Sequence, residues 1–189
     1  MFIEKSNGKL RPLGISTVRD PVCMTAAMLV LEPIFDVDLP PEQYAYRPRR
    51  NAHQAGAEVG DRLFQGHMDV VDADLVDYFG SIPHADLFKS VARRIVDRRV
   101  LHLIKMWLEC PLEETDDGGR KKRTTQTRDE RRGIPQEAPL SPLLANLYMR
   151  RLVLGWKKFG LEESLGSRIV TYADDLVIFC RKGKAEEAL

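Results

Sequence analysis

Apolar residues along this chain switch between helical and strand spacing. From Pro21 to Phe35 they recur every three or four residues, which predicts a helix. The same spacing predicts helices over 53–65, from Pro83 through Ile95, over 101–108, and in "PLSPLLANLYM", residues 139–149. The segment "DVVDADL", residues 69–75, alternates apolar and polar residues and predicts a strand. "NGKLRPLGI", residues 7–15, combines a turn signal with alternation and predicts a short hairpin. The order is therefore mixed, of the α+β class.

Two adjacent aspartates interrupt the apolar run "IVTYADDLVIFC", residues 169–180. A continuous buried strand would bury at least one of these carboxylates, which costs several kcal/mol unless it is compensated. A tight turn at Ala173, Asp174 and Asp175 removes the conflict, because "IVTYA" and "LVIFC" then pair as an antiparallel hairpin. We therefore expect a hairpin inserted in a core, with only its tip at a cleft.

Residues 113–132, "EETDDGGRKKRTTQTRDERR", are polar throughout and predict a loop between two elements. Seven Arg or Lys residues between Arg120 and Arg132 face two acidic residues, a local net charge of +5, whereas the chain as a whole carries +1. This segment is either a solvated loop or a surface for a polyanion.

Composition excludes several classes of protein. The chain of 189 residues is 43% hydrophobic and 30% charged, enough to fold around a core as one domain or one domain and part of another. No apolar run approaches the ~20 residues of a membrane span, and the N-terminus lacks a signal peptide's apolar segment. Cys23, Cys110 and Cys180 stand far apart among apolar neighbours. They predict reduced, buried thiols in a cytoplasmic protein without a zinc site.

The strand over 69–75 places Asp72 and Asp74 on one face. One interpretation is an edge strand with a wet face. The other is that this strand lies beside the hairpin, so that Asp74, Asp174 and Asp175 gather. Such carboxylates repel one another unless cations lie between them, and their hard oxygens suit Mg²⁺. Two such ions ~4 Å apart stabilise the attacking and leaving oxygens in phosphoryl transfer.

Five sequence blocks occur in the order known from one family. "GKLRPLGISTVRD", "LVLEPIFD", "YAYRPRRNAHQA", "DADLVDYF" and "GIPQEAPLSPLLANLYM" precede "YADD". The chain resembles, from about Lys9 onward, the reverse transcriptase domain of group II intron-encoded proteins and their bacterial relatives. The resemblance implies a fingers–palm fold with an antiparallel palm sheet and packed helices. It implies a fingers-like region over 1–66 and a palm over 67–189, including the polar loop 111–133, with the chain ending before the thumb.

The resemblance also implies roles for individual residues. Asp74, Asp174 and Asp175 would be the catalytic carboxylates that hold two Mg²⁺ ions, with Mn²⁺ as a substitute. The other implied roles are triphosphate binding by Arg11, packing under the nucleotide sugar by Phe79, contact with the nucleotide and template base by Gln136, a place near the primer end for Tyr172, and nucleic-acid backbone contacts by Arg47, Arg49 and Arg50. Ordinary solvated surface is the alternative for these three arginines.

The implied activity is RNA-directed DNA synthesis on an RNA template, here an intron RNA of a mobile element, from a DNA primer and deoxynucleotides. The chain departs from the family at Glu137, Ala45 and Arg49, where glycine is expected. Glu137 and the missing thumb favour an alternative, a non-catalytic, maturase-like remnant that binds RNA and assists splicing, whereas retention of all three metal-binding aspartates argues against it. A nucleotide cyclase would share the acidic hairpin but does not predict the "RPLGI" and "PLSPLLAN" blocks.

Overall fold

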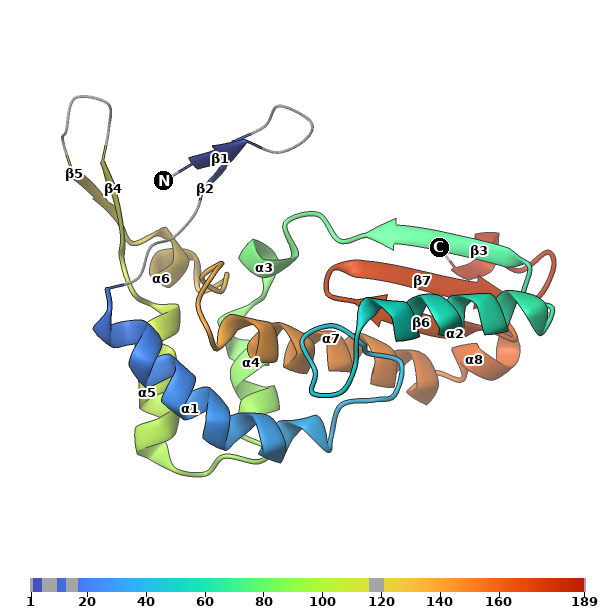
Figure 1. Ribbon diagram of the computed structural model, residues 1–189, viewed down its shortest axis with the longest axis horizontal. Coiled ribbons are helices and arrows are strands. Elements are labelled where there is room, and N and C mark those ends of the chain that lie inside the picture. Colours follow the sequence, from blue (N-terminus) through green and yellow to red (C-terminus); the bar gives the residue numbers. More distant parts are fainter. Residues whose placement is uncertain (1, 5–9, 13–16, 116–120, 189) are drawn as a thin grey trace. The chain divides into compact units, whose positions relative to one another are not determined.

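The structure is a computed structural model that describes residues 2–4, 10–12, 17–115 and 121–188 (Figure 1). The chain forms two compact units, each assembled from two separate stretches of sequence. The first unit comprises Met1–Ile34 and Phe79–Ala145, and the second comprises Phe35–Tyr78 and Asn146–Leu189. The boundaries of these units differ from those of the fingers and palm regions expected at 1–66 and 67–189. The division into fingers and palm stays a prediction.

A three-stranded antiparallel sheet organises the second unit. Its order is β3 (Asp69–Asp74), β7 (Asp175–Cys180) and β6 (Arg168–Tyr172), so that the predicted acidic strand does lie beside the predicted hairpin. In the register, Asp74 lies opposite Asp175, and Asp175 lies opposite Tyr172. Residues 101 positions apart in the sequence are thereby brought to one end of the sheet, since Asp74 (residue 74) pairs with Asp175 (residue 175).

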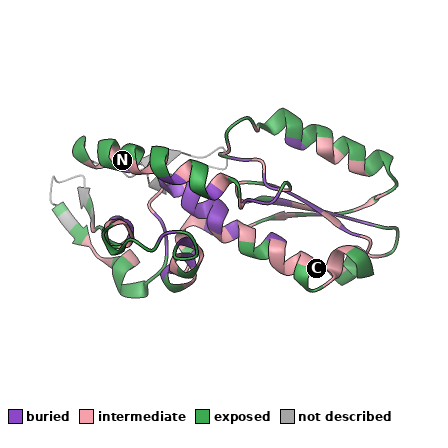
Figure 2. Cartoon of the chain, turned by 90° about the horizontal axis from the view of Figure 1, so that it is seen from below, coloured by how far each residue is buried: buried purple, intermediate pink, exposed green. Residues whose placement is uncertain are grey.

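Helices cover both faces of this sheet. On one face Val71, Leu176 and Ile178 pack with Val153 of α7 (Ser141–Lys158). On the other face Val170 and Phe179 pack with Ala55 of α2 (Ala52–Phe64). Figure 2 shows the resulting burial in the strands and in the first half of α7, whereas α2 is exposed over most of its surface. The apolar flanks of the aspartates are therefore buried from two sides.

The helix predicted over 53–65 is confirmed as α2, and its start has a local cause. The Asn51 side chain accepts a hydrogen bond from the Gln54 backbone N–H, and the Gln54 side chain accepts one from the Asn51 backbone N–H, both at 3.0 Å. This reciprocal capping box satisfies two of the backbone donors that a helix start leaves without partners.

The first unit contains most of the remaining predicted elements. The predicted N-terminal hairpin is present as β1 (Phe2–Glu4) paired with β2 (Leu10–Pro12), and its connecting residues lie outside the described part of the chain. The helix expected over 21–35 belongs to α1 (Arg19–Asp36), which begins in this unit. The other helices are α3 (Tyr78–Ser81), α4 (His84–Val91) and α5 (Arg98–Leu108). Helix α4 ends before Ile95, although that residue is buried as expected.

The prediction of a loop over 113–132 was wrong. The segment forms a two-stranded ribbon, β4 (Leu112–Thr115) with β5 (Lys121–Thr124), followed by the short helix α6 (Gln126–Glu130). The register places Glu113 opposite Arg123, and the Lys121 ammonium lies 2.6 Å from the Glu113 carboxylate. Cross-strand pairs of opposite charge stabilise the ribbon. Because its strands consist mainly of charged residues, the sequence has no alternating apolar pattern that would predict them.

The expectation of three buried thiols also needs correction. Cys180 is buried, but Cys23 and Cys110 are exposed free thiols, because Cys23 lies on the outward side of α1 and Cys110 follows the end of α5. The one-turn helix α8 (Leu161–Ser164) precedes the hairpin in the chain, and a single 3₁₀ turn over Glu186–Ala188 follows it. Within the described ranges, every helix is too short or too polar to cross a bilayer.

Candidate active site

The turn between β6 and β7 contains only Ala173 and Asp174. Ala173 has a φ of +58°, whereas the φ of Asp174 is not positive. This is the pattern of a type II′ turn, whose first central residue is normally glycine. An alanine in the left-handed region costs about 1–2 kcal/mol, so the rest of the unit must hold the turn in this strained shape.

The turn positions three carboxylates at one end of the sheet. The Leu75 N–H donates to the Asp174 carbonyl oxygen at 3.2 Å, which makes Asp74 and Asp175 a non-hydrogen-bonded cross-strand pair. In such pairs the Cα atoms are only about 4.5 Å apart and the side chains are on the same face. Asp72 lies on that face two residues earlier, and both Asp72 and Asp74 are exposed. The expected juxtaposition of Asp74, Asp174 and Asp175 is present.

Neighbouring carboxylates repel the charge of Asp175. Its pKa is raised above the ordinary value, first because its surroundings at the sheet partly remove it from water, and then because Asp174, Asp74 and Asp72 are close. Three neighbouring carboxylates make this group harder to ionise unless a cation compensates the charge. Asp72, to which the resemblance gave no role, therefore adds to the negative field.

The chemistry of this donor set fits divalent ions of the magnesium type, which prefer carboxylate oxygens and water. In the conformation described, no three His, Cys, Asp or Glu side chains among the described residues lie close enough to share one ion. The side chains of Asp74 and Asp175 nevertheless project from adjacent strands on the same face of the sheet. Rotation about side-chain bonds can bring their oxygens around one ion without any change in the backbone.

Tyr78 lies near Asp174 and pairs with a second tyrosine, Tyr148. The rings of Tyr78 and Tyr148 have centroids 6.4 Å apart and are tilted by 39°. Burial raises the pKa of Tyr78, and nearby Tyr148 and Asp174 add to the effect. Tyr78 therefore stays neutral and supports the site as an uncharged, packed ring. Sequence reasoning missed it, and the only available signal was its place four residues after Asp74.

Of the four residues predicted to bind the substrates, Tyr172 alone shares the unit of the carboxylates. It lies opposite Asp175 on the same face and is 37% exposed, so that its ring is available at the open end of the sheet. Arg11, Phe79 and Gln136 belong to the first unit. Arg11 lies in β2 opposite Ile3, and its side chain is outside the described part of the chain. The Ile134 N–H donates to the Phe79 carbonyl oxygen at 2.9 Å, which joins the segments that carry Phe79 and Gln136.

The predicted arginine cluster separates into different roles. The Arg47 side chain is 8% exposed, forms an ion pair with Asp36 at 2.7 Å, and donates to the carbonyl oxygens of Asp36, Pro40 and Gln43. Its donors are committed to the second unit's own backbone, so the predicted contact of Arg47 with nucleic acid is withdrawn. The Arg50 guanidinium lies 4.9 Å from the Tyr44 ring centroid and donates to the Pro41 carbonyl, whereas Arg49 is exposed.

Two of the departures from the family pattern fall on left-handed backbone. Glu137 has a φ of 68° and Arg49 a φ of 63°. Glycine adopts this region without a steric penalty, whereas other residues are strained there. Ala45, the third departure, does not have a positive φ, and it is buried. Its carbonyl oxygen accepts a hydrogen bond from the Asn146 side chain at 2.8 Å. The backbone at two of the three positions where the resemblance implies glycine therefore has the conformation that glycine adopts without strain.

Comparison with known proteins agrees with this geometry. The family model described as reverse transcriptase (RNA-dependent DNA polymerase) matches residues 3–189. Protein YkfC of Escherichia coli is 36% identical over 154 residues, covering 79% of this chain and 38% of YkfC. The group II intron-encoded protein LtrA of Lactococcus lactis is 32% identical over 153 residues, covering 80% of this chain and 24% of LtrA. The chain therefore spans well under half the length of these relatives.

Solved structures show the same fold. A partial Cas6-RT-Cas1–Cas2 complex contains a chain that matches 90% of this protein with a TM-score of 0.52 and 25% identity, over 28% of its own length. Telomerase from Candida albicans matches 90% with a TM-score of 0.62 and 11% identity, over 32% of its length. The telomerase match concerns the fold alone. Because the family model extends across both units and the acidic hairpin has the geometry the motif blocks implied, this chain belongs to the reverse transcriptase (RNA-dependent DNA polymerase) family.

Proposed function

We propose that this chain is the catalytic-carboxylate portion of an RNA-directed DNA polymerase of the group II intron type. The observation that carries the proposal is the cross-strand pair of Asp74 and Asp175 with Asp174 in the adjoining turn. The reaction is nucleotidyl transfer: the bond from a primer 3′-oxygen to the α-phosphorus of a deoxynucleotide forms as the bond to pyrophosphate breaks. The partners are an RNA template of intron type, a DNA primer and deoxynucleoside triphosphates.

Asp74, Asp174 and Asp175 would hold the divalent ions, two Mg²⁺ in the proposed mechanism with Mn²⁺ as a substitute. Bound there, the ions supply activation of the hydroxyl and neutralisation of the charge that develops on the phosphate oxygens. The chain's own part is positional. The strained turn keeps Asp174 beside the pair on the strands, and the apolar packing of α7 and α2 on the two faces of the sheet supports the acidic end.

The remaining residues would bind the substrates. Tyr172, at the open end of the sheet, would pack near the primer end. Arg11 would contact the triphosphate, Phe79 would lie under the sugar and disfavour a 2′-hydroxyl, and Gln136 would contact the nucleotide and template base. Arg49 and Arg50 and the basic side of the β4–β5 and α6 segment would contact the nucleic-acid backbone, a salt-dependent and largely sequence-independent interaction.

Primer extension on a polyriboadenylate template with an oligodeoxythymidylate primer tests the proposal, with Mg²⁺ or Mn²⁺. Asp174→Ala is expected to abolish extension while leaving the thermal unfolding midpoint near that of the original chain. Asp61→Asn is the matched control, because Asp61 is an exposed carboxylate on α2 in the same unit. Extension that survives Asp174→Ala would refute the assignment of the carboxylates.

A second candidate is RNA binding without catalysis, as in a maturase-like remnant. The strained glutamate at position 137, which adds negative charge where the family has glycine, is the observation that favours it. A nuclear intron maturase of Arabidopsis thaliana is 27% identical over 123 residues. Absence of extension by the original chain and by Glu137→Gly, together with a retained shift of RNA in a gel, would favour this candidate over the polymerase.

A further inference from the structure

A pocket in the first unit has no role in the chemistry proposed above. It lies among α4, α5 and the segment of α6 and has a volume of about 1010 Å³. That volume reaches the upper end of the ~300–1,000 Å³ typical of ligand pockets. All its lining residues fall between His84 and Arg131, so the pocket belongs to the first unit alone, whereas the carboxylates belong to the second.

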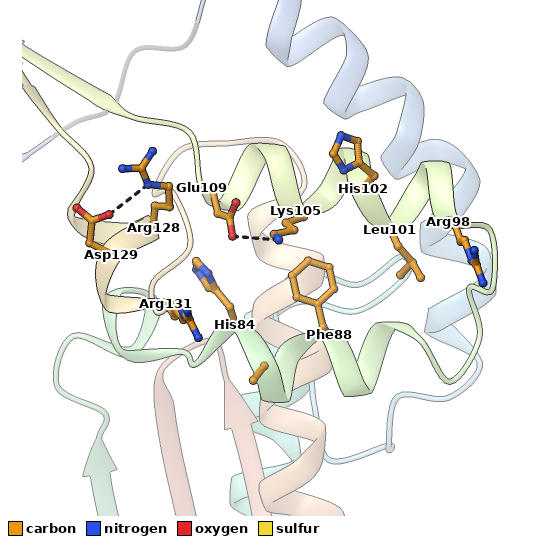
Figure 3. A pocket seen from close by; sticks show the side chains of 11 residues that line it. His84, Phe88, Arg98, Leu101, His102, Lys105, Glu109, Arg128, Asp129 and Arg131 are labelled. Atoms are coloured by element: carbon orange, nitrogen blue, oxygen red, sulfur yellow. Dashed lines mark hydrogen bonds and ion pairs between the residues drawn. The ribbon is translucent and has the colours of Figure 1, made fainter.

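The floor of the pocket is apolar. Figure 3 shows Phe88 of α4 and Leu101 of α5 turned toward the space between the two helices. Both side chains are half-buried, so that part of the Phe88 ring remains available. At one wall the His84 Nε2–H donates to the Gly133 carbonyl oxygen at 2.7 Å, which fixes the start of α4 against the segment after α6.

Positive charge surrounds this floor. Four cations line the pocket against two carboxylates, a net charge of +2 with neutral histidines. Lys105 is paired with Glu109 at 3.7 Å and Arg128 with Asp129 at 3.2 Å. Arg98 and Arg131 have no ion pair with any residue that the structure describes. Figure 3 shows them at opposite ends of the pocket, with Phe88 between them.

An available aromatic ring between two uncompensated guanidinium groups matches the repeating chemistry of a nucleic-acid single strand. Each unpaired base offers a flat face for stacking, and the phosphates on either side offer negative charge. A duplex would not match, because its bases are already stacked and paired. An acidic peptide would satisfy the cations but would leave the half-buried ring without a stacking partner.

We infer that this pocket binds single-stranded nucleic acid, with an unpaired base against Phe88 and the flanking phosphates at Arg98 and Arg131. The inference rests on the proposed function only in supposing that nucleic acid is the partner. It adds a contact that does not involve the catalytic carboxylates, through which the protein holds a strand outside the paired region.

Fluorescence anisotropy of the full chain with a labelled oligouridylate, in EDTA so that the carboxylate site holds no metal, measures the contact. Phe88→Leu is expected to weaken binding between about five- and 150-fold, the range for loss of one base stack. The double change Arg98→Gln with Arg131→Gln is expected to lower the slope of log K against log salt by about 1.4, or about 0.7 for each phosphate. Arg93→Gln with Arg99→Gln is the matched control, since both arginines are exposed and neither lines the pocket.

Photocrosslinking locates the strand independently of any variant's folding. An oligouridylate carrying 5-iodouridine is expected to crosslink to the peptide that contains Phe88, and an unlabelled duplex is expected to compete poorly. Crosslinks confined to other peptides would overturn the inference. So would a control pair that weakens binding as much as the Arg98 and Arg131 pair, or competition by polyglutamate equal to that by oligouridylate.

Failure of the inference and failure of the proposed function are distinguishable. Primer extension that depends on Asp174, without a crosslink at Phe88, refutes the pocket and leaves the polymerase. A crosslink at Phe88 without any extension supports the pocket and refutes the polymerase.

Discussion

Removing the charge of Asp175 is expected to stabilise the metal-free protein, although this residue belongs to the proposed catalytic set. Asp175 lies opposite Asp74, and its pKa is raised by partial burial and by Asp174, Asp74 and Asp72. Asp175→Asn keeps the shape of the side chain and deletes the repulsion. The free energy of unfolding should therefore rise at neutral pH, in contrast to the usual effect of a substitution.

The magnitude follows from the number and exposure of the neighbours. Charge pairs at exposed positions are worth about 0.2–1 kcal/mol each, because water screens them. Asp175 is exposed and has three acidic neighbours, so the expected gain is roughly 1–2 kcal/mol after this screening. For a chain of this size such a gain raises the thermal midpoint by about 2–8 °C.

The sign of the pH dependence is determined by the direction of the pKa shift. The pKa of Asp175 in the folded state is raised above that of an unfolded aspartate, about 3.9. Between these two values the folded state binds more protons, so the free energy of unfolding falls as pH rises through this window. The advantage of Asp175→Asn is therefore absent below about pH 3.9 and complete above the folded-state pKa.

Urea unfolding followed by circular dichroism in EDTA, at neutral pH and near pH 4, measures the effect. Added Mg²⁺ should stabilise the original chain in proportion to its binding, and should stabilise Asp175→Asn less. Asp61→Asn on α2 is the control and should change stability by less than about 0.5 kcal/mol. If Asp175→Asn is less stable than the original chain at neutral pH in EDTA, the electrostatic account of the cluster is incorrect.

Three further predictions concern the backbone and the arginine cluster. Ala173→Gly should raise the free energy of unfolding by about 1 kcal/mol by relieving the strain of a φ of +58°, and Ala173→Val should lower it. A thermal melt in which the glycine variant is not the most stable and the valine variant not the least stable would contradict the assigned turn. Glu137→Gly and Arg49→Gly should each stabilise by about 1 kcal/mol for the same reason, and only Arg49→Gly should also weaken RNA binding in an anisotropy assay. Arg47→Ala should lower the free energy of unfolding by about 3 kcal/mol, since it leaves Asp36 and three carbonyl oxygens without their donor. A loss below about 1 kcal/mol, measured by urea unfolding, would show that the ion pair contributes little to stability.

Local sequence was sufficient for the elements whose own residues carry a periodic signal. The helix over residues 53–65, the acidic strand over 69–75 and the hairpin at Asp174 were predicted correctly, because apolar spacing or an interrupted apolar run determines each. The ribbon of β4 and β5 was missed because cross-strand charge pairs hold it, and such pairs are visible only once the partner strand and register are known.

The sequence by itself determined the chemistry available to this protein: three aspartates in motif order, an apolar hairpin to carry two of them, and blocks that imply a polymerase. The tertiary structure decided which groups are free to act. It joined Asp74 to Asp175 across strands, since register is a long-range property, and it assigned Arg47 to an internal ion pair while leaving Arg49 exposed. The reason is physical: residue type specifies what a side chain can bind, whereas packing specifies whether its donors and charges are already satisfied.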